Sequence, residues 1–271
     1  MISPHPELVA HKTFAHLKLG RQAARPDPRT LQLAKYLDTA QLPPIPASAD
    51  FVSDVPSWPM YANDQLGDCT CAAAGHMIEA WTYSAGTDRT PQEAAVETMY
   101  WETGNPPAAS GTAGSSTDNG REEIQVLNYW RQTGLGGDTI GAYAAVDPTN
   151  HTDMQAAVYL FGGVYLGVAL PKTAQTQQVW DVVAHASKHD RAPGSWGGHA
   201  VPCHAYDQNT VTVITWGAPL QATWAFNDAY VDEAYAIISN DFLKGSGTTI
   251  EGFNLAQLQA DLAAVESGPS S

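Results

Sequence analysis

The order of the secondary-structure patterns is the feature of this chain that most restricts its fold. Helical periodicity comes first, and alternating runs rich in β-branched and aromatic residues follow. Helices followed by strands indicate an α+β protein, with a helical lobe that faces an antiparallel β lobe. The predicted helices cover residues 30–37, 71–86, 90–101, 121–134 and 151–161. The predicted strands cover residues 164–170, 197–207, 210–217, 221–227 and 233–239.

The chain is expected to form one main domain with an extension at each end. Residues 51–240 make the domain, with the helical lobe at 51–135 and the β lobe at 160–240. Residues 1–50 form an N-terminal arm or a short propeptide-like segment, which ends in the proline-rich connector QLPPIPASAD. Residues 241–271 form a C-terminal helix and a frayed tail.

The charge balance excludes one large class of partners. The 271 residues include 28 acidic and 13 basic side chains, which gives a formal net charge of −15. Nucleic-acid binding needs a basic surface, so no nucleic-acid partner is predicted. The longest apolar run, residues 158–170, is shorter than the roughly 20 residues of a membrane span, so no membrane partner is predicted either.

The three cysteines are Cys69, Cys71 and Cys203. An odd and sparse number does not describe a disulfide scaffold and favours a reducing compartment. The first residues, MISPHPELVAHKTF, lack the apolar run of a secretory signal. We therefore expect a cytoplasmic or virion-associated protein with no signal peptide, and we expect no cofactor and no metal.

One cysteine and one histidine stand in positions that suit nucleophilic catalysis. Cys69 follows the turn Gly67-Asp68 at the entry to an alanine-rich helix, where the helix dipole and free N–H groups lower a thiol pKa. His199 follows two glycines at the start of a predicted core strand far downstream. A thiol needs such a base from a distant part of the chain. The pair predicts a Cys69–His199 dyad.

Four motifs in the same order resemble the papain-like cysteine peptidases, most of all divergent bacterial or phage-type members. NDQLGDCT resembles the nucleophile segment of that family, and GGHAVPCHAYD resembles its histidine strand. TWG and EAYAII resemble the two later strands, and the order holds over residues 51–239. The resemblance implies a two-lobed papain-like fold with a groove between the lobes, which the small-residue loop at 104–120 would border. It also implies a peptide or protein substrate.

The resemblance assigns a role to each candidate residue. Cys69 would attack the carbonyl carbon, and His199 would take the proton and return it. The family's oxyanion-hole glutamine lies six residues before the nucleophile, which is Asn63 for Cys69 and Gln65 for Cys71. Either alignment supplies an amide donor. The stretch GDCT at residues 67–70 favours Cys69 as the nucleophile, and Cys71 is then expected to be a buried residue.

The chain departs from the family at the residue that orients the histidine. The family has an asparagine there, whereas the two possible alignments reach Ile214 or Thr215. The Thr215 hydroxyl could hydrogen-bond the imidazole, or Asn227 or Asp228 could approach from the next strand.

Three other functions compete with a peptidase or amidase. The first is a catalytically silent papain-like binding or structural module, for example a phage virion or actinobacterial protein, which the missing asparagine favours. The second is an acyl transferase that uses the same cysteine and histidine. The third is a zinc site, although the cysteine spacing fits no standard zinc finger; its ligands would come from Cys69, Cys71, His76, Cys203 and His204.

Overall fold

The computed structural model describes residues 13–25, 30–38, 40–239, 256–257 and 259–260. Its helices are α2 (Cys69–Ser84), α3 (Glu93–Glu102), α4 (Glu123–Gln132), α5 (His151–Phe161) and α6 (Trp224–Tyr230), with the 3-10 helices η1 (Leu33–Lys35) and η2 (Lys172–Thr176). Its strands are β1 (Ala49–Asp50), β2 (Ile140–Ala145), β3 (Val164–Leu170), β4 (Val179–Trp180), β5 (Gly197–Tyr206), β6 (Thr210–Thr215), β7 (Ala218–Thr223) and β8 (Val231–Ser239).

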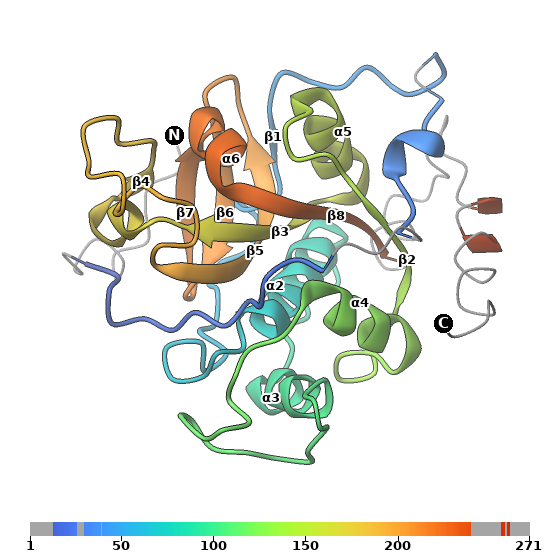
Figure 1. Cartoon of the computed structure of the whole chain (residues 1–271). Helices are drawn as coiled ribbons and strands as arrows, with labels where there is room; N and C mark the ends of the chain where they lie inside the picture. Colours follow the sequence, from blue (N-terminus) through green and yellow to red (C-terminus); the bar gives the residue numbers. More distant parts are fainter. Residues whose placement is uncertain (1–12, 26–29, 39, 240–255, 258, 261–271) are drawn as a thin grey trace.

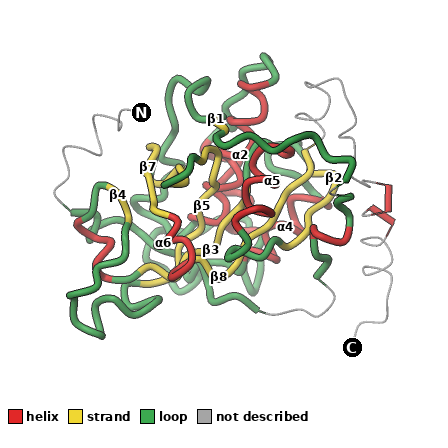
Figure 2. Tube along the Cα trace, turned by 90° about the horizontal axis from the view of Figure 1, so that it is seen from above, coloured by secondary structure: helices red, strands yellow, loops and turns green. Residues whose placement is uncertain are grey.

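The strands form one sheet in the order β2-β8-β3-β5-β6-β7-β4, and β1 pairs with β5. All pairings are antiparallel except the one between β4 and β7. Helices α3 and α4 lie on one side of the strands, and α2 runs between them and the sheet (Figure 1). Helix α2 packs mainly against β5, and α5 packs against β8, β5 and β3; both helices overlap these strands when the molecule is seen from above (Figure 2). This arrangement confirms the predicted α+β class.

Helix α2 is the central helix, and its composition explains why. From Cys69 to Thr82 every residue is buried, because alanines on several faces let the sheet and the other helices approach closely. The indole N–H of Trp81 donates to the carbonyl of Phe161 at the end of α5, at 2.7 Å. The Tyr165 hydroxyl of β3 donates to the Thr70 carbonyl at 2.6 Å. These two bonds fix both ends of α2 against the rest of the core.

Most of the predicted elements are confirmed, and three details are wrong. The predicted strand at 221–227 ends at Thr223, whose side chain caps the helix α6 that begins at Trp224. The predicted helix at 30–37 is reduced to η1. The helix predicted at 90–101 begins at Glu93 instead, after Gln92. The predicted C-terminal helix at 254–265 lies outside the described residues apart from two short stretches.

Residues 13–25, which we name the covering segment, make a turn at 15–17 and continue as an extended stretch that crosses the front of α2 (dark blue in Figure 1). One edge of the segment bonds the β side: Arg21 donates its backbone N–H to Gly198 on β5, at 3.1 Å. The other edge bonds the helical side, where Arg121 donates its N–H to Gly20 at 2.8 Å and accepts from Gln22 at 2.9 Å. The covering segment therefore joins the two sides of the molecule.

Within the described residues, no helix is both long and apolar enough to cross a membrane.

Candidate active site

Cys69 is the first residue of α2, and hydrogen bonds hold the turn that precedes it. The Asp118 carboxylate accepts the N–H of Gly67 at 2.8 Å. The amide nitrogen of Asn63 donates to the carboxylate of Asp68 at 3.1 Å and to the carbonyl of Leu66 at 3.2 Å. The Cys69 side chain is only 1% exposed. The prediction that Cys69 stands at the entry to an alanine-rich helix is confirmed.

Strand β5 brings the predicted base to the same place. The backbone N–H of Ala200 donates to the Cys69 sulfur at 3.4 Å, so the residue that follows His199 touches the thiol. His199 is itself 1% exposed and pairs with Val168 across the sheet. The fold thus joins the helix start and the histidine strand, which are far apart in sequence.

Two residues at the end of β6 fix the His199 ring. The Nε2 atom of His199 lies 2.7 Å from the Thr215 hydroxyl oxygen. The indole of Trp216 stacks on the imidazole, with ring centroids 4.5 Å apart and planes inclined by 17°. With Nε2 engaged, the ring has one further nitrogen, Nδ1, which is buried and makes no hydrogen bond within the described part of the chain. This nitrogen is the one free to accept a proton.

The other two candidates for orienting the histidine are engaged elsewhere. Asn227 lies on α6 and donates its amide to the Pro148 carbonyl at 2.7 Å. Asp228 pairs with His151, with an oxygen 2.7 Å from the ring nitrogen. Because residues 224–230 form a helix instead of a strand, these side chains contact Pro148 and His151, just before and at the start of α5. Thr215 is the group that contacts His199.

The two candidate oxyanion donors differ in their surroundings. Asn63 is buried, and the two hydrogen bonds described above use both N–H groups of its amide. Gln65 is exposed at the surface of the same turn. In this conformation the donors closest to the thiol are backbone N–H groups.

Cys71 lies two residues after Cys69 on α2 and is fully buried in the main core. Its sulfur lies 3.9 Å from the Thr70 hydroxyl. Burial raises the pKa of the Cys71 thiol above its ordinary value. Its position fits the predicted buried residue and leaves Cys69 as the thiol beside the histidine strand.

The covering segment lies directly over Cys69. The backbone N–H of Gly20 hydrogen-bonds the Cys69 sulfur, and the Gly20 carbonyl accepts from Arg121 on the opposite side. A Cβ atom on Gly20 would overlap the backbone of Gly67, so only glycine permits this approach. The segment excludes solvent from the thiol.

The segment also covers Trp216, the residue that stacks on His199. The Phe14 ring stacks on the Trp216 indole at a centroid distance of 5.6 Å. The indole N–H donates to the Lys18 carbonyl at 3.0 Å. Asn119 and Gly120, at the end of the predicted small-residue loop, accept from the Gln22 amide, so this loop borders the covered region.

Burial sets the protonation of the pair in this covered form. Burial raises the pKa of the Cys69 thiol to about 12, an effect that the N–H of Ala200 partly offsets. Burial, together with the positive charge of Arg21, lowers the pKa of His199 to about 3. At neutral pH both groups are therefore uncharged: a thiol and a neutral imidazole.

The two histidines of the zinc alternative both pack against Trp58, and each hydrogen-bonds a backbone carbonyl. His76 bonds the Pro59 carbonyl at 2.8 Å, and His204 bonds the Gly162 carbonyl at 2.7 Å. Within the described residues, no group of three His, Cys, Asp or Glu side chains gathers closely enough to hold a metal ion.

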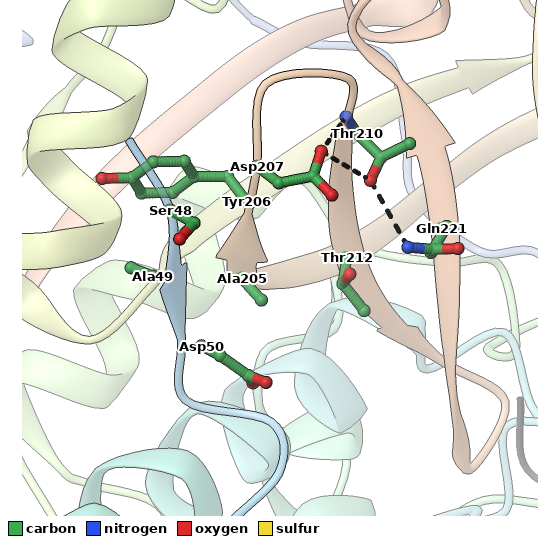
Figure 3. A pocket seen from close by; sticks show the side chains of 9 residues that line it. All are labelled: Ser48, Ala49, Asp50, Ala205, Tyr206, Asp207, Thr210, Thr212 and Gln221. Carbon is green, nitrogen blue, oxygen red and sulfur yellow. Dashed lines mark hydrogen bonds between the residues drawn. The ribbon is translucent and has the colours of Figure 1, made fainter. Parts of the chain in front are cut away.

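A surface pocket of about 260 Å³ lies away from the dyad, between β1 and the turn that joins β5 to β6 (Figure 3). Asp207 accepts from the N–H and the hydroxyl of Thr210, and the Gln221 amide donates to the same hydroxyl (Figure 3). Because these polar groups already satisfy one another, we assign this pocket no role.

No protein-family model matches the sequence, and a search of the curated proteins finds no match. Solved structures do match. Xylellain, a cysteine protease from Xylella fastidiosa, has a TM-score of 0.62 and 11% identity, and the match covers 83% of this chain and 97% of that chain. The fold is that of the papain-like cysteine proteases.

Two further matches are precursor forms. Digestive procathepsin L 3 from the Tenebrio molitor larval midgut has a TM-score of 0.53 and 11% identity, over 86% of this chain and 78% of that chain. The proform of Amb a 11, a cysteine protease and major ragweed pollen allergen, has a TM-score of 0.54 and 14% identity, over 84% and 70%. At this identity the papain-like likeness concerns the fold.

Proposed function

We propose that this chain is a thiol-dependent peptidase or amidase that acts through Cys69 and His199. One observation carries the proposal: the His199 ring is held by Thr215 and Trp216 directly beside the strand residue that contacts the Cys69 sulfur. An oriented imidazole next to a thiol at a helix N-terminus is the arrangement that nucleophilic catalysis needs. The papain-like fold agrees with this chemistry, and a peptide or protein is the substrate class.

The reaction requires the covering segment to leave the groove. The Cys69 sulfur then attacks the carbonyl carbon of an amide while His199 takes the thiol proton. Collapse of the tetrahedral intermediate releases the amine, which receives that proton, and leaves a thioester. Water hydrolyses the thioester with His199 as the base. The Cys69 backbone N–H stabilises the oxyanion, and a side-chain amide joins it if Asn63 or Gln65 reorients.

In this proposal residues 13–25 act as a propeptide-like inhibitor. Gly20, the residue of the segment that contacts the sulfur, presents its N–H, and its carbonyl accepts a hydrogen bond from Arg121 instead of lying where a substrate carbonyl would be attacked. The segment also keeps Cys69 and His199 uncharged, because it buries both and brings the Arg21 charge close to the ring. Departure of the segment would hydrate both groups and favour the thiolate–imidazolium pair.

The second candidate is a catalytically silent module on the same fold. Two observations favour it: a threonine hydroxyl orients the histidine, and both N–H groups of Asn63 are used within the protein. Such a module would keep ordinary, slowly reacting thiols after the groove is opened.

Alkylation by iodoacetamide separates the two candidates. We would map labelling of each cysteine by mass spectrometry from pH 4 to 9 in the full-length chain carrying Gly20→Ala, which displaces the covering segment. A peptidase predicts fast labelling of Cys69 below pH 6 that disappears when His199→Ala is added. Slow labelling with a midpoint near 8.5, unchanged by His199→Ala, would rule out the dyad.

Hydrolysis of a mixed peptide pool is the second measurement. Activity that requires both Cys69 and His199, and that survives Cys71→Ser and Cys203→Ser, supports the peptidase. Absence of hydrolysis despite a reactive Cys69 would point to a transferase or an amidase of non-peptide substrates.

A further inference from the structure

The Arg21 side chain lies in a buried pocket of acidic residues, one residue along the covering segment from the glycine that contacts Cys69. Its side chain is 1% exposed. Nε lies 3.3 Å from a carboxylate oxygen of Glu123, and Nη2 lies 2.6 Å from Asp232 and 2.8 Å from Glu233. One guanidinium thus faces three carboxylates.

Glu123, at the closed end of the pocket, is not satisfied by this contact. Its side chain is fully buried, and neither of its carboxylate oxygens makes a hydrogen bond within the described residues. The 3.3 Å approach of Arg21 lacks hydrogen-bond geometry. Burial, and then the Glu233 carboxylate, raise the pKa of Glu123 well above its ordinary value, and the positive charge of Arg21 opposes this rise. A buried carboxylate with free acceptor positions strongly favours a cation in front of it.

The backbone of β3 leaves room for a flat group in the same pocket. A Cβ atom on Gly167 would overlap Nε, Cζ and Nη2 of Arg21. The glycine therefore makes the space that the guanidinium plane occupies. Any larger residue at position 167 would fill the pocket.

The pocket also has a route to solvent. The Asp232 side chain is 45% exposed, and Asp232 and Glu233 line an adjoining surface pocket of about 340 Å³. A ligand side chain could therefore enter from outside once Arg21 has left.

We propose that this pocket is the specificity site of the enzyme and that it selects an arginine side chain of the substrate. This arginine is adjacent in sequence to the substrate residue that lies at Cys69. The inference rests on the proposed function for its catalytic meaning, but the pocket can be tested without catalysis. Arg21 occupies the site as a substrate arginine does. A guanidinium reaches acids on two sides of the pocket at once, whereas a lysine ammonium is a single point of charge, so arginine is preferred over lysine.

Binding is the first test because it does not need an active dyad. The probes are Nα-acetyl-arginine methylamide and its citrulline counterpart, which has nearly the same shape without the charge. In the full-length Arg21→Ala chain, we expect the arginine probe to bind ~30-fold or more tightly than citrulline by calorimetry. If removal of Arg21 prevents folding, the same titration is made on the Gly20→Ala chain.

Two variants test whether Glu123 is responsible for the preference for arginine over citrulline. Glu123→Gln should reduce the preference for arginine over citrulline by about tenfold or more, because it removes the buried charge and keeps the shape. Asp54→Asn removes an exposed carboxylate from the loop after β1 and should leave the preference unchanged. Equal binding of the two probes, or a selectivity that Glu123→Gln does not change, would overturn the proposal and leave the pocket as a latch for the covering segment alone.

Hydrolysis gives the second test, and it distinguishes failure of the arginine pocket from failure of the proposed peptidase activity. The Gly20→Ala chain is given fluorogenic peptides in which arginine, lysine, citrulline or leucine is moved through the positions around the cleaved bond. Arginine at one fixed position should raise kcat/KM. Hydrolysis with a leucine preference would overturn the arginine pocket while the peptidase stands. Arginine-selective binding without any hydrolysis would overturn the peptidase while the pocket stands.

Discussion

The Thr215 hydroxyl lies 2.7 Å from Nε2 of His199, where it can accept the ring N–H and hold the ring with Nδ1 free. In the proposed mechanism, a hydroxyl in this place would perform the orienting role that a carboxylate or amide performs in catalytic triads. The tautomer and the direction of the imidazole therefore depend on one short hydrogen bond and on the stacked Trp216.

Thr215→Val is expected to lower kcat/KM of the opened Gly20→Ala chain about 10- to 100-fold, the effect of one hydrogen bond to a charged group. The basic limb of the pH–rate profile should move to lower pH, because the imidazolium loses its acceptor. Thr215→Ser keeps the hydroxyl and should retain both activity and profile. Thr212→Val, on the same strand but at the pocket of Figure 3, is the matched control. An unchanged pH profile in Thr215→Val would refute the orienting role.

Gly20→Ala is expected to expose the active thiol. The added methyl group would overlap the Gly67 backbone, so the covering segment must move away. The rate at which iodoacetamide labels Cys69 at neutral pH should rise roughly tenfold or more, because the reagent reaches the thiol without prior local unfolding of the covering segment. Cys71 and Cys203 should keep their slow rates and serve as internal controls. Ala23→Ser, an exposed position of the same segment, should not change the Cys69 rate. Equal rates in all three chains would show that the segment does not protect the thiol.

Arg21→Met is expected to lower the free energy of unfolding by about 3–5 kcal/mol, because three carboxyl groups lose the cation they share and Glu123, whose pKa burial already raises, must take up a proton to stay buried. The double variant Arg21→Met, Glu123→Gln should recover a large part of that loss. Chemical denaturation of the parent, the two single variants and the double variant gives the coupling energy between the two side chains directly. Additive effects would mean that the two charges do not interact in the folded protein.

Glu79 is expected to make the protein less stable as the pH rises. It lies fully buried on α2, and burial raises its pKa from 4.5 to about 8. The folded state thus holds this proton more tightly than the unfolded state. The stabilisation is complete below pH 4.5 and is lost as the pH rises through 8.

Glu79→Gln should remove that loss, so that the variant exceeds the parent chain in stability by roughly 3–5 kcal/mol above pH 8 and by much less at pH 5. Urea unfolding at several pH values measures the difference. Glu93→Gln, at the exposed start of α3, should follow the parent curve at every pH. Parallel curves for Glu79→Gln and the parent would exclude a proton on Glu79 in the folded state.

The candidate site was predicted from sequence in its main parts. Cys69 was recognised by its place between a glycine turn and an alanine-rich helix, and His199 by the glycines and the alternating strand around it. These signals are local, and the structure brings both segments to one place. The contact between Thr215 and His199 remained one of three possibilities, because it depends on how far β7 runs before the chain turns into α6.

Residue patterns were enough to predict the order of the elements and the helix-then-strand class, since periodicity records which face of each element is buried. That α2 is buried on every side follows from the tertiary packing around it. Only the tertiary structure decided that residues 13–25 cross Cys69 and that Arg21 enters a pocket containing Glu123. An extended segment has no period of its own and is held by backbone hydrogen bonds that any residue can make. Its path therefore depends on the surface it meets, which exists only after the two sides of the molecule have folded.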